Sequence, residues 1–249
     1  MDEHEEPLEG GNASSGDVRV GSTVRKPWTA QTASVQEFMT AVRAAGVDVP
    51  APLGRDDRGR QMIEFVPGRL AMREPTMTVR QLARVGALVR AIHDAAGDFT
   101  PTERPADDLL LPAPEHELMC HNDLAPWNLI VGDRWVFIDW DGAGPSSRLW
   151  DLAYSAQTFT LSDIHEPAAH AATRLAAFVD GYRADRDLRE QLPAAMAQRT
   201  RAMYDLLASS QLSGREPWGS MYADGHGEHW RGASGYVALH QDVWARALA

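Results

Sequence analysis

Cysteine, long apolar runs and positive charge are all scarce in this sequence. Its 249 residues include one cysteine, Cys120, which excludes an internal disulfide and a cysteine-based zinc cluster. No stretch approaches the roughly 18 consecutive apolar residues of a membrane-spanning helix, and the acidic start at Met1–Glu6 is unlike a signal peptide. We therefore expect a cytoplasmic protein without a membrane partner.

The excess of negative charge argues against one class of partner. The formal net charge is −11, whereas a nucleic-acid-binding surface needs a basic face that neutralises phosphates. The same charge would suit a cationic substrate, and it is equally consistent with solubility alone. We expect no nucleic-acid partner, and a monomer or a weak homodimer.

The hydrophobic pattern changes character along the chain. Residues 7–26 predict two short strands around a polar, glycine-rich turn at 9–16. A helix is expected from Ser34, because Ser34–Glu37 resembles a capping box, and a strand is expected at Met62–Val66. Helical periodicity dominates later, at 82–92 and from about 162 to 248. These patterns predict an α+β fold of two lobes.

The predicted lobes have different architectures and meet at a hinge. Residues 1–67 would form a small antiparallel-sheet lobe that binds a nucleotide, and residues 68–249 a larger, mainly helical lobe that carries catalysis and substrate binding. A cleft between two lobes is a natural place for a ligand.

The most informative stretch is residues 121–141. It reads HxDxxxxN, with His121, Asp123 and Asn128, and continues through two apolar runs joined by a turn to Asp139 in the pattern Ile-Asp-x-Asp. The apolar runs predict a hairpin that carries Asn128 and Asp139 toward each other. The protein-kinase catalytic loop has the same spacing of histidine, aspartate and asparagine, with a later aspartate that holds metal.

These residue types suit phosphoryl transfer, in which the protein mainly positions a hydroxyl and neutralises phosphate charge. Asp123 would accept a hydrogen bond from the acceptor hydroxyl and take its proton. Asn128 and Asp139 would supply the hard oxygen ligands that Mg²⁺ prefers. His121 is predicted to hold the loop by hydrogen bonds rather than to titrate in catalysis. The alternative is that these residues only cap turns.

At these residues the sequence resembles the aminoglycoside phosphotransferase and choline kinase family. The resemblance runs from Leu8–Gly11 through residues 18–27 and the catalytic stretch to Arg148–Ala153. It implies a protein-kinase-like fold and a small-molecule kinase that uses Mg²⁺ with ATP or GTP as the donor. The acceptor would be a hydroxyl of a small molecule such as a cationic aminoglycoside or an amino alcohol. Antibiotic resistance, amino-alcohol metabolism and sugar phosphorylation stay open, because the family changes its substrate elements freely.

The resemblance also implies roles on the first strands and helix. Val24 would touch the nucleotide base, and Lys26 would reach the α- and β-phosphates. Glu37 is the available acidic partner for Lys26. Without the resemblance, Lys26 is equally a solvated side chain of an edge strand, and Glu37 equally an acid near a helix N-terminus.

Further roles are implied at the glycine-rich turn, the hinge and a later helix. Backbone amides of Gly10 and Gly11 would cover phosphate, although the turn lacks a full GxGxxG pattern and also suits a flexible hairpin loop. Glu64 and Val66 would offer backbone groups to a purine. Asp151 looks like a structural residue that supports the catalytic loop from below.

Other functional classes remain open. A catalytically silent, kinase-like binding module would keep the fold and recognise a ligand or a protein. A protein kinase is disfavoured, because Pro145 and residues 148–151 follow Asp141 too soon for a long activation segment. His226 and His229 suit a loop or helix end better than a metal site, because no third ligand of matching spacing is evident.

Overall fold

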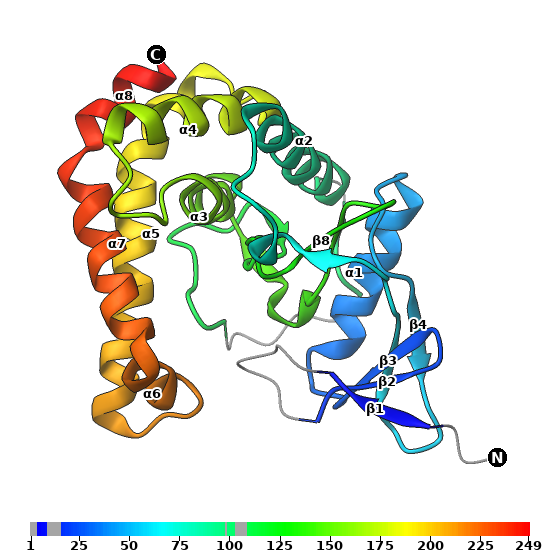
Figure 1. Cartoon of the computed structure of the whole chain (residues 1–249). Helices are drawn as coiled ribbons and strands as arrows, with labels where there is room; N and C mark the ends of the chain where they lie inside the picture. The colour runs from blue at the N-terminus through cyan, green and yellow to red at the C-terminus, as the bar shows by residue number, and fades with distance from the viewer. Residues whose placement is uncertain (1–3, 9–15, 98, 103–108) are drawn as a thin grey trace.

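The chain begins with a five-stranded antiparallel sheet, shown in blue and cyan in Figure 1. The computed structural model of the protein describes residues 4–8, 16–97, 99–102 and 109–249. The strand order is β1-β2-β3-β5-β4, and every neighbouring pair is antiparallel. The strands are β1 (Glu5–Pro7), β2 (Val18–Val20), β3 (Thr23–Lys26), β4 (Pro52–Arg55) and β5 (Gln61–Glu64).

Helix α1 (Thr32–Ala44) joins this sheet to the main core. Its buried apolar side chains follow helical spacing, at Val35, Phe38, Met39 and Val42. The helix starts two residues before the predicted Ser34, whose hydroxyl donates to the carbonyl of Gln31 (2.9 Å) instead of capping the helix end. The predicted capping box is therefore wrong, although the helix is present.

Short strands beyond the hinge carry the catalytic stretch. Strand β6 (Arg69–Leu70) pairs with β8 (Leu129–Val131), which pairs with β9 (Val136–Phe137), so the predicted hairpin is present. Strand β7 (Leu118–Cys120) pairs with β10 (Gly144–Ser146). The chain thus leaves the first sheet after Glu64 and joins a second one at Arg69; the lobe boundary at residue 67 stays a prediction.

The rest of the chain is mainly helical. Figure 1 shows α5 and α7 side by side at the end of the molecule away from the five-stranded sheet. No described helix is long and apolar enough to cross a membrane. The helices are α2 (Val79–Ala96), α3 (Arg148–Thr160), α4 (Ala168–Tyr182), α5 (Arg186–Ser213), α6 (Trp218–Met221), α7 (Gly227–Leu239) and α8 (Gln241–Leu248), with short turns η1 (Ala71–Arg73), η2 (Trp140–Gly142) and η3 (Tyr222–His226).

Local sequence explains where key helices begin and how closely they pack. Thr78 and Gln81 form a capping box at the start of α2. The side chain of Ser147 accepts from the amide of Trp150 and caps α3 (3.2 Å). Gly86 lets α2 approach α4, because a Cβ there would overlap the carbonyl of Phe178. A sheet-rich first part and a mainly helical remainder confirm the predicted fold class.

Candidate active site

The loop between β7 and β8 carries the HxDxxxxN residues. Leu124 and Ala125 are fully buried and anchor the loop. Asn122 has a left-handed backbone (φ 66°), and its side-chain amide donates to the carbonyl of Gly142 (3.1 Å). Asparagine tolerates this conformation better than most residues. The loop is therefore fixed on both sides of Asp123, whose backbone amide donates to His121 Nδ1 (3.3 Å).

Asp123 has a hydrogen-bond donor on each carboxylate oxygen. Asn128 Nδ2 donates to Oδ2 (2.7 Å), and the hydroxyl of Tyr154, on α3, donates to Oδ1 (2.9 Å). Burial raises the pKa of Asp123, and the charge of Asp139 adds to this effect; His121, Tyr154 and Asn128 act in the opposite direction. A carboxylate with a raised pKa, held by two donors, suits general-base work.

His121 is fully buried and joins the loop to the following hairpin. Its Nε2 lies 3.1 Å from the carbonyl oxygen of Ile138, and its ring lies against Trp140 with centroids 4.6 Å apart. Both ring nitrogens thus have hydrogen-bond partners, one in the loop and one after the hairpin, as the predicted support role requires. That role stays a prediction.

Lys26 lies among three carboxylates at the end of β3. Its Nζ is 2.5 Å from Asp139 Oδ1, 2.8 Å from Asp141 Oδ2 and 3.4 Å from Asp17 Oδ2. Burial opposes the charge, but the three carboxylates outweigh it and raise the pKa of Lys26. In turn, although burial acts against it, Lys26 holds the pKa of Asp139 below its usual range. The first sheet and the catalytic stretch are thus joined by ion pairs between the buried ammonium of Lys26 and partly exposed carboxylates.

The backbone explains how Asp139 and Asp141 reach the same ammonium. Asp139 has a left-handed conformation (φ 63°), which turns the chain sharply after β9 into η2. Gln61, which is opposite Lys26 in the β3–β5 register, donates from Nε2 to Asp141 Oδ1 (3.0 Å). Asp141 is therefore held by two residues of the sheet.

The oxygen atoms here fit a magnesium ion. Asn128 uses its amide nitrogen on Asp123, and its Oδ1 has no donor among the residues that the structure describes. The side chains of Asp139 and Asp141 are 38% and 42% exposed. Carboxylate and amide oxygens are the donor types that Mg²⁺ prefers.

The prediction that Glu37 is the acidic partner of Lys26 is wrong. Glu37 accepts from the backbone amide of Thr102 (3.0 Å) and from its hydroxyl, and these hydrogen bonds lower the pKa of Glu37. The carboxylates around Lys26 come instead from Asp17, Asp139 and Asp141. Glu37 is half-buried on α1, and its carboxylate lies against the segment after α2.

The other residues predicted to contact the nucleotide, at the hinge, on β3 and in the glycine-rich turn, differ in their surroundings. The side chain of Glu64 pairs with Arg134 (2.5 Å), and its backbone amide donates to Ala51. Val66 is buried, and its backbone N–H has no hydrogen-bond partner in the described part of the chain. Val24 is half-buried on β3. Gly10 and Gly11 lie outside the described residues.

Asp151 is buried, but its hydrogen bond is made with a residue other than the predicted one. Its Oδ2 lies 3.1 Å from His93 Nε2 on α2, while Oδ1 has no partner among the described residues. His93, Asp151 and Cys120 each have one side-chain atom of a kind that can bind a metal ion, and these three atoms lie within 4.8 Å of one another. Cys120 immediately precedes the catalytic loop, so Asp151 lies close to that region. Among the described residues no hydrogen bond joins Asp151 to the loop, and its supporting role stays a prediction.

Three residues of the site were missed by sequence reasoning. Tyr154 contacts Asp123 across 31 positions, and Asp17 and Asp141 surround Lys26. The sequence contains one further signal, and it concerns Lys26, the predicted residue that Asp17 and Asp141 surround. It is the single lysine of the sequence, whereas every other basic side chain with a permanent charge is arginine. A position that keeps lysine in such a chain is a candidate for a specific role.

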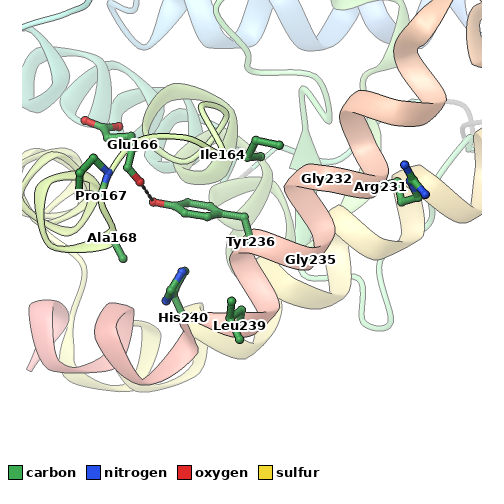
Figure 2. Close-up of a pocket in the computed structure, with 10 residues that line it drawn as sticks. All are labelled: Ile164, Glu166, Pro167, Ala168, Arg231, Gly232, Gly235, Tyr236, Leu239 and His240. Atoms are coloured by element: carbon green, nitrogen blue, oxygen red, sulfur yellow. Dashed lines mark hydrogen bonds between the residues drawn. The ribbon is translucent and has the colours of Figure 1, made fainter.

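A separate cavity of about 600 Å³ lies between the segment before α4 and helix α7. Figure 2 shows Tyr236 crossing this space to donate its hydroxyl to the carbonyl of Glu166 (2.8 Å). None of the lining residues belongs to the catalytic stretch. The cavity is therefore distinct from the site around Asp123.

Comparison with known proteins agrees with this geometry. Residues 102–192 match the model of the phosphotransferase enzyme family. The trifolitoxin immunity protein of Rhizobium leguminosarum bv. trifolii is 29% identical over 154 residues, which cover 59% of this chain and 58% of that protein. The match thus spans less than two thirds of that relative's length.

Solved structures of small-molecule kinases have the same fold. A microcompartment-associated aminopropanol kinase has a TM-score of 0.69 at 15% identity, over 99% of this chain and 95% of that chain. An amicoumacin kinase gives 0.65 at 13% identity, over 90% and 86%. A choline/ethanolamine kinase family protein from Mesorhizobium loti gives 0.59 at 18%, over 99% and 92%. The chain therefore has the kinase-like fold, and residues 102–192 match the model of the phosphotransferase enzyme family; both findings agree with the resemblance found in the sequence.

Proposed function

We propose that this protein is a magnesium-dependent kinase that transfers the γ-phosphate of ATP or GTP to a hydroxyl of a small, amine-bearing molecule. The observation that carries the proposal is the arrangement of Asp123. Its carboxylate is held by Asn128 and Tyr154, beside the acids that surround Lys26. One base, one group of hard oxygen ligands and one ammonium are the parts that phosphoryl transfer requires.

The chain's own residues divide the work. Asp123 orients the acceptor hydroxyl and accepts its proton, while Asn128 and Asp139 hold the metal, with Asp141 next to them. A magnesium ion held by these residues would neutralise charge on the phosphate oxygens. Lys26 lies within reach of the same place and contributes a second positive charge. The backbone N–H of Val66, which has no partner among the described residues, is suited to donate a hydrogen bond to a purine base, and it does not discriminate between ATP and GTP.

The acceptor is proposed to carry an amine. The net charge of −11 favours a cationic partner, and kinases named for aminopropanol and choline/ethanolamine, as well as a protein solved as a complex with gentamicin, have this fold. The likeness to a trifolitoxin immunity protein and to an amicoumacin kinase favours an antibiotic as the acceptor over a metabolite. A cytoplasmic location belongs to the same proposal, because nucleoside triphosphates are plentiful there.

The proposal is tested by ATP consumption over a panel of aminoglycosides, peptide antibiotics, amino alcohols, sugars and nucleosides. Asp123→Asn is expected to lower kcat by about 10²- to 10⁴-fold with nearly unchanged nucleotide affinity. Asp139→Ala is expected to weaken magnesium-nucleotide binding as well, measured by calorimetry. Asp133→Asn, in the exposed turn between β8 and β9, is the matched control and should change neither quantity.

Two results would contradict this assignment. Equal loss of nucleotide binding in Asp123→Asn and Asp139→Ala would contradict the separate roles proposed for the base and the metal ligand. Nucleotide binding without turnover on any compound, unaffected by Asp123→Asn, would favour the silent binding module instead.

A further inference from the structure

Three buried side chains next to the catalytic loop form a compact group outside the candidate active site. His93 comes from α2, Cys120 from β7 and Asp151 from α3, and these three elements contact one another. The three residues are at most 1% exposed. One nitrogen, one sulfur and one carboxylate oxygen of the group lie within 4.8 Å of one another. The group is separate from the residues proposed to hold magnesium.

The described residues leave the carboxylate of Asp151 incompletely satisfied. Its Oδ2 lies 3.1 Å from His93 Nε2, but its Oδ1 is buried and has no hydrogen-bond partner among the described residues. In the same part of the chain, no lysine or arginine forms an ion pair with Asp151. The buried guanidinium of Arg199, on α5, lies 4.1 Å from the ring centroid of Tyr154 and acts on Asp151 only at longer range. A buried polar atom in this state calls for a water molecule or an ion.

The second hydrogen bond of His93 suits a metal ligand. Its Nδ1 lies 2.8 Å from the hydroxyl oxygen of Tyr182, on α4. A proton on Nδ1, donated to that oxygen, leaves the lone pair of Nε2 facing the carboxylate of Asp151. Metal-bound histidines commonly donate their other N–H to an oxygen in this way. In this tautomer Nε2 and Oδ2 are both acceptors, and a cation beside them would remove their repulsion; the opposite tautomer makes an ordinary hydrogen bond and leaves Oδ1 unpartnered.

We propose that His93, Cys120 and Asp151 bind a structural zinc ion, which ties α2, β7 and α3 together next to the catalytic loop. Zn²⁺ accepts nitrogen, sulfur and carboxylate oxygen at about 2.0–2.3 Å, which places the ligand atoms of a tetrahedral site about 3.3–3.6 Å apart. Small side-chain movements reach these separations from the observed limit of 4.8 Å. A water molecule takes the fourth position. The inference goes beyond the proposed kinase function and does not rest on it.

The charges of such a site balance, and its ligand types select the metal. Burial and the neighbouring charge of Asp151 raise the pKa of the Cys120 thiol, so the metal-free thiol keeps its proton. Zinc binding releases that proton to solvent, and Zn²⁺, one thiolate and one carboxylate then sum to zero charge. Mg²⁺ prefers oxygen ligands alone, so a sulfur ligand favours zinc over the metal of the candidate active site.

The sequence pattern does not reveal this group. A single cysteine excludes a zinc site built from several cysteines, but a mixed site needs only one. His93, Cys120 and Asp151 are far apart along the chain and match no ligand spacing, so only the packing of α2, β7 and α3 brings them together.

The single cysteine makes cobalt spectroscopy the central test. Protein produced in zinc-poor medium with added Co²⁺ should show a thiolate-to-cobalt charge-transfer band in the near ultraviolet. Because the sequence holds one cysteine, a band of this kind is assigned to Cys120. The band should vanish in Cys120→Ser and persist in Asp139→Ala, which removes a proposed magnesium ligand. A wild type without the band overturns the inference and leaves a buried water as the partner of Asp151.

Zinc affinity and thermal unfolding give a second readout. Cys120→Ser and Asp151→Asn should each lower zinc affinity by at least about 10-fold, measured by competition with a chelator. His170→Gln is the matched control and should leave the affinity unchanged, because His170 is an exposed histidine that pairs with Glu166 (3.0 Å). Zinc at about 100 times its Kd should raise the Tm of the metal-free wild type by about 5–11 °C and leave that of Cys120→Ser unchanged.

Zinc bound with equal affinity by the wild type and Cys120→Ser would be adventitious and would overturn the inference. None of these measurements uses turnover, so the zinc site and the kinase function can each fail without the other.

Discussion

Replacing Lys26 by methionine should destabilise the nucleotide-free protein measurably. Lys26 is 11% exposed at its side chain and neutralises Asp139 and Asp141, which are 38% and 42% exposed. Breaking a fully buried ion pair costs about 3–5 kcal/mol, whereas an exposed pair contributes about 0–1 kcal/mol. The partial exposure of the carboxylates places Lys26→Met between these limits, at about 2 kcal/mol.

The expected loss is large enough for thermal unfolding to detect. For a chain of this size, 1 kcal/mol shifts Tm by about 2–4 °C, so Lys26→Met should lower Tm by about 4–8 °C. Arg186→Met is the matched control, because Arg186 pairs with Glu190 on an exposed helix face and should contribute less than about 0.5 kcal/mol. A Tm for Lys26→Met equal to that of Arg186→Met would refute the reasoning.

The pH dependence gives a second check on the same variant. The pKa of Asp139 is lowered in the folded state, so its contribution is present above the unfolded pKa of about 3.9 and is lost as pH falls through the folded pKa. The pKa of Lys26 is raised, so its contribution is present below about 10.4 and is lost only as pH rises beyond that value. The Tm difference between the wild type and Lys26→Met should therefore stay constant between about pH 5 and 8.

Two further predictions concern residues outside the charged group. Glu37→Gln should leave kcat and nucleotide affinity unchanged in the ATP-consumption assay, because Glu37 contacts Thr102 rather than Lys26. Gly86→Ala should lower the free energy of unfolding by about 1–3 kcal/mol in urea titration, because its Cβ would overlap the carbonyl of Phe178. Gly235→Ala, on α7 with open space around it, should instead stabilise by about 0.5–1 kcal/mol; destabilisation by both would point to a different cause.

The parts of the fold that local patterns specify were predictable. The β8–β9 hairpin follows from two apolar runs and a glycine turn, and α2 follows from its apolar spacing. The start of α1 was placed two residues late, because a capping-box pattern at Ser34 is a local rule that packing can override. Element types were thus easier to predict than their ends.

Contacts between distant elements were not predictable in the same way. The resemblance suggested Glu37 as the acidic partner of Lys26, but the Glu37 carboxylate contacts the segment at Thr102, which the sequence pattern does not place. Arg199 is one of many arginines, and its burial becomes evident only when α5 packs on α3. Tyr154 is an ordinary core aromatic until its hydroxyl meets Asp123.

The single lysine shows why residue type matters at the centre of the site. Arginine supplies the other permanent positive charges of this sequence, yet a planar guanidinium presents its donors in one plane. The ammonium of Lys26 is compact and presents three donors in different directions, which matches the three carboxylates of Asp17, Asp139 and Asp141. Under the proposed function, the same property would let it exchange a carboxylate for a phosphate oxygen by rotating a flexible stem. A lysine at position 26 is therefore suited to hold the acids together and to serve the proposed phosphate contact, whereas an arginine would be suited to only one geometry.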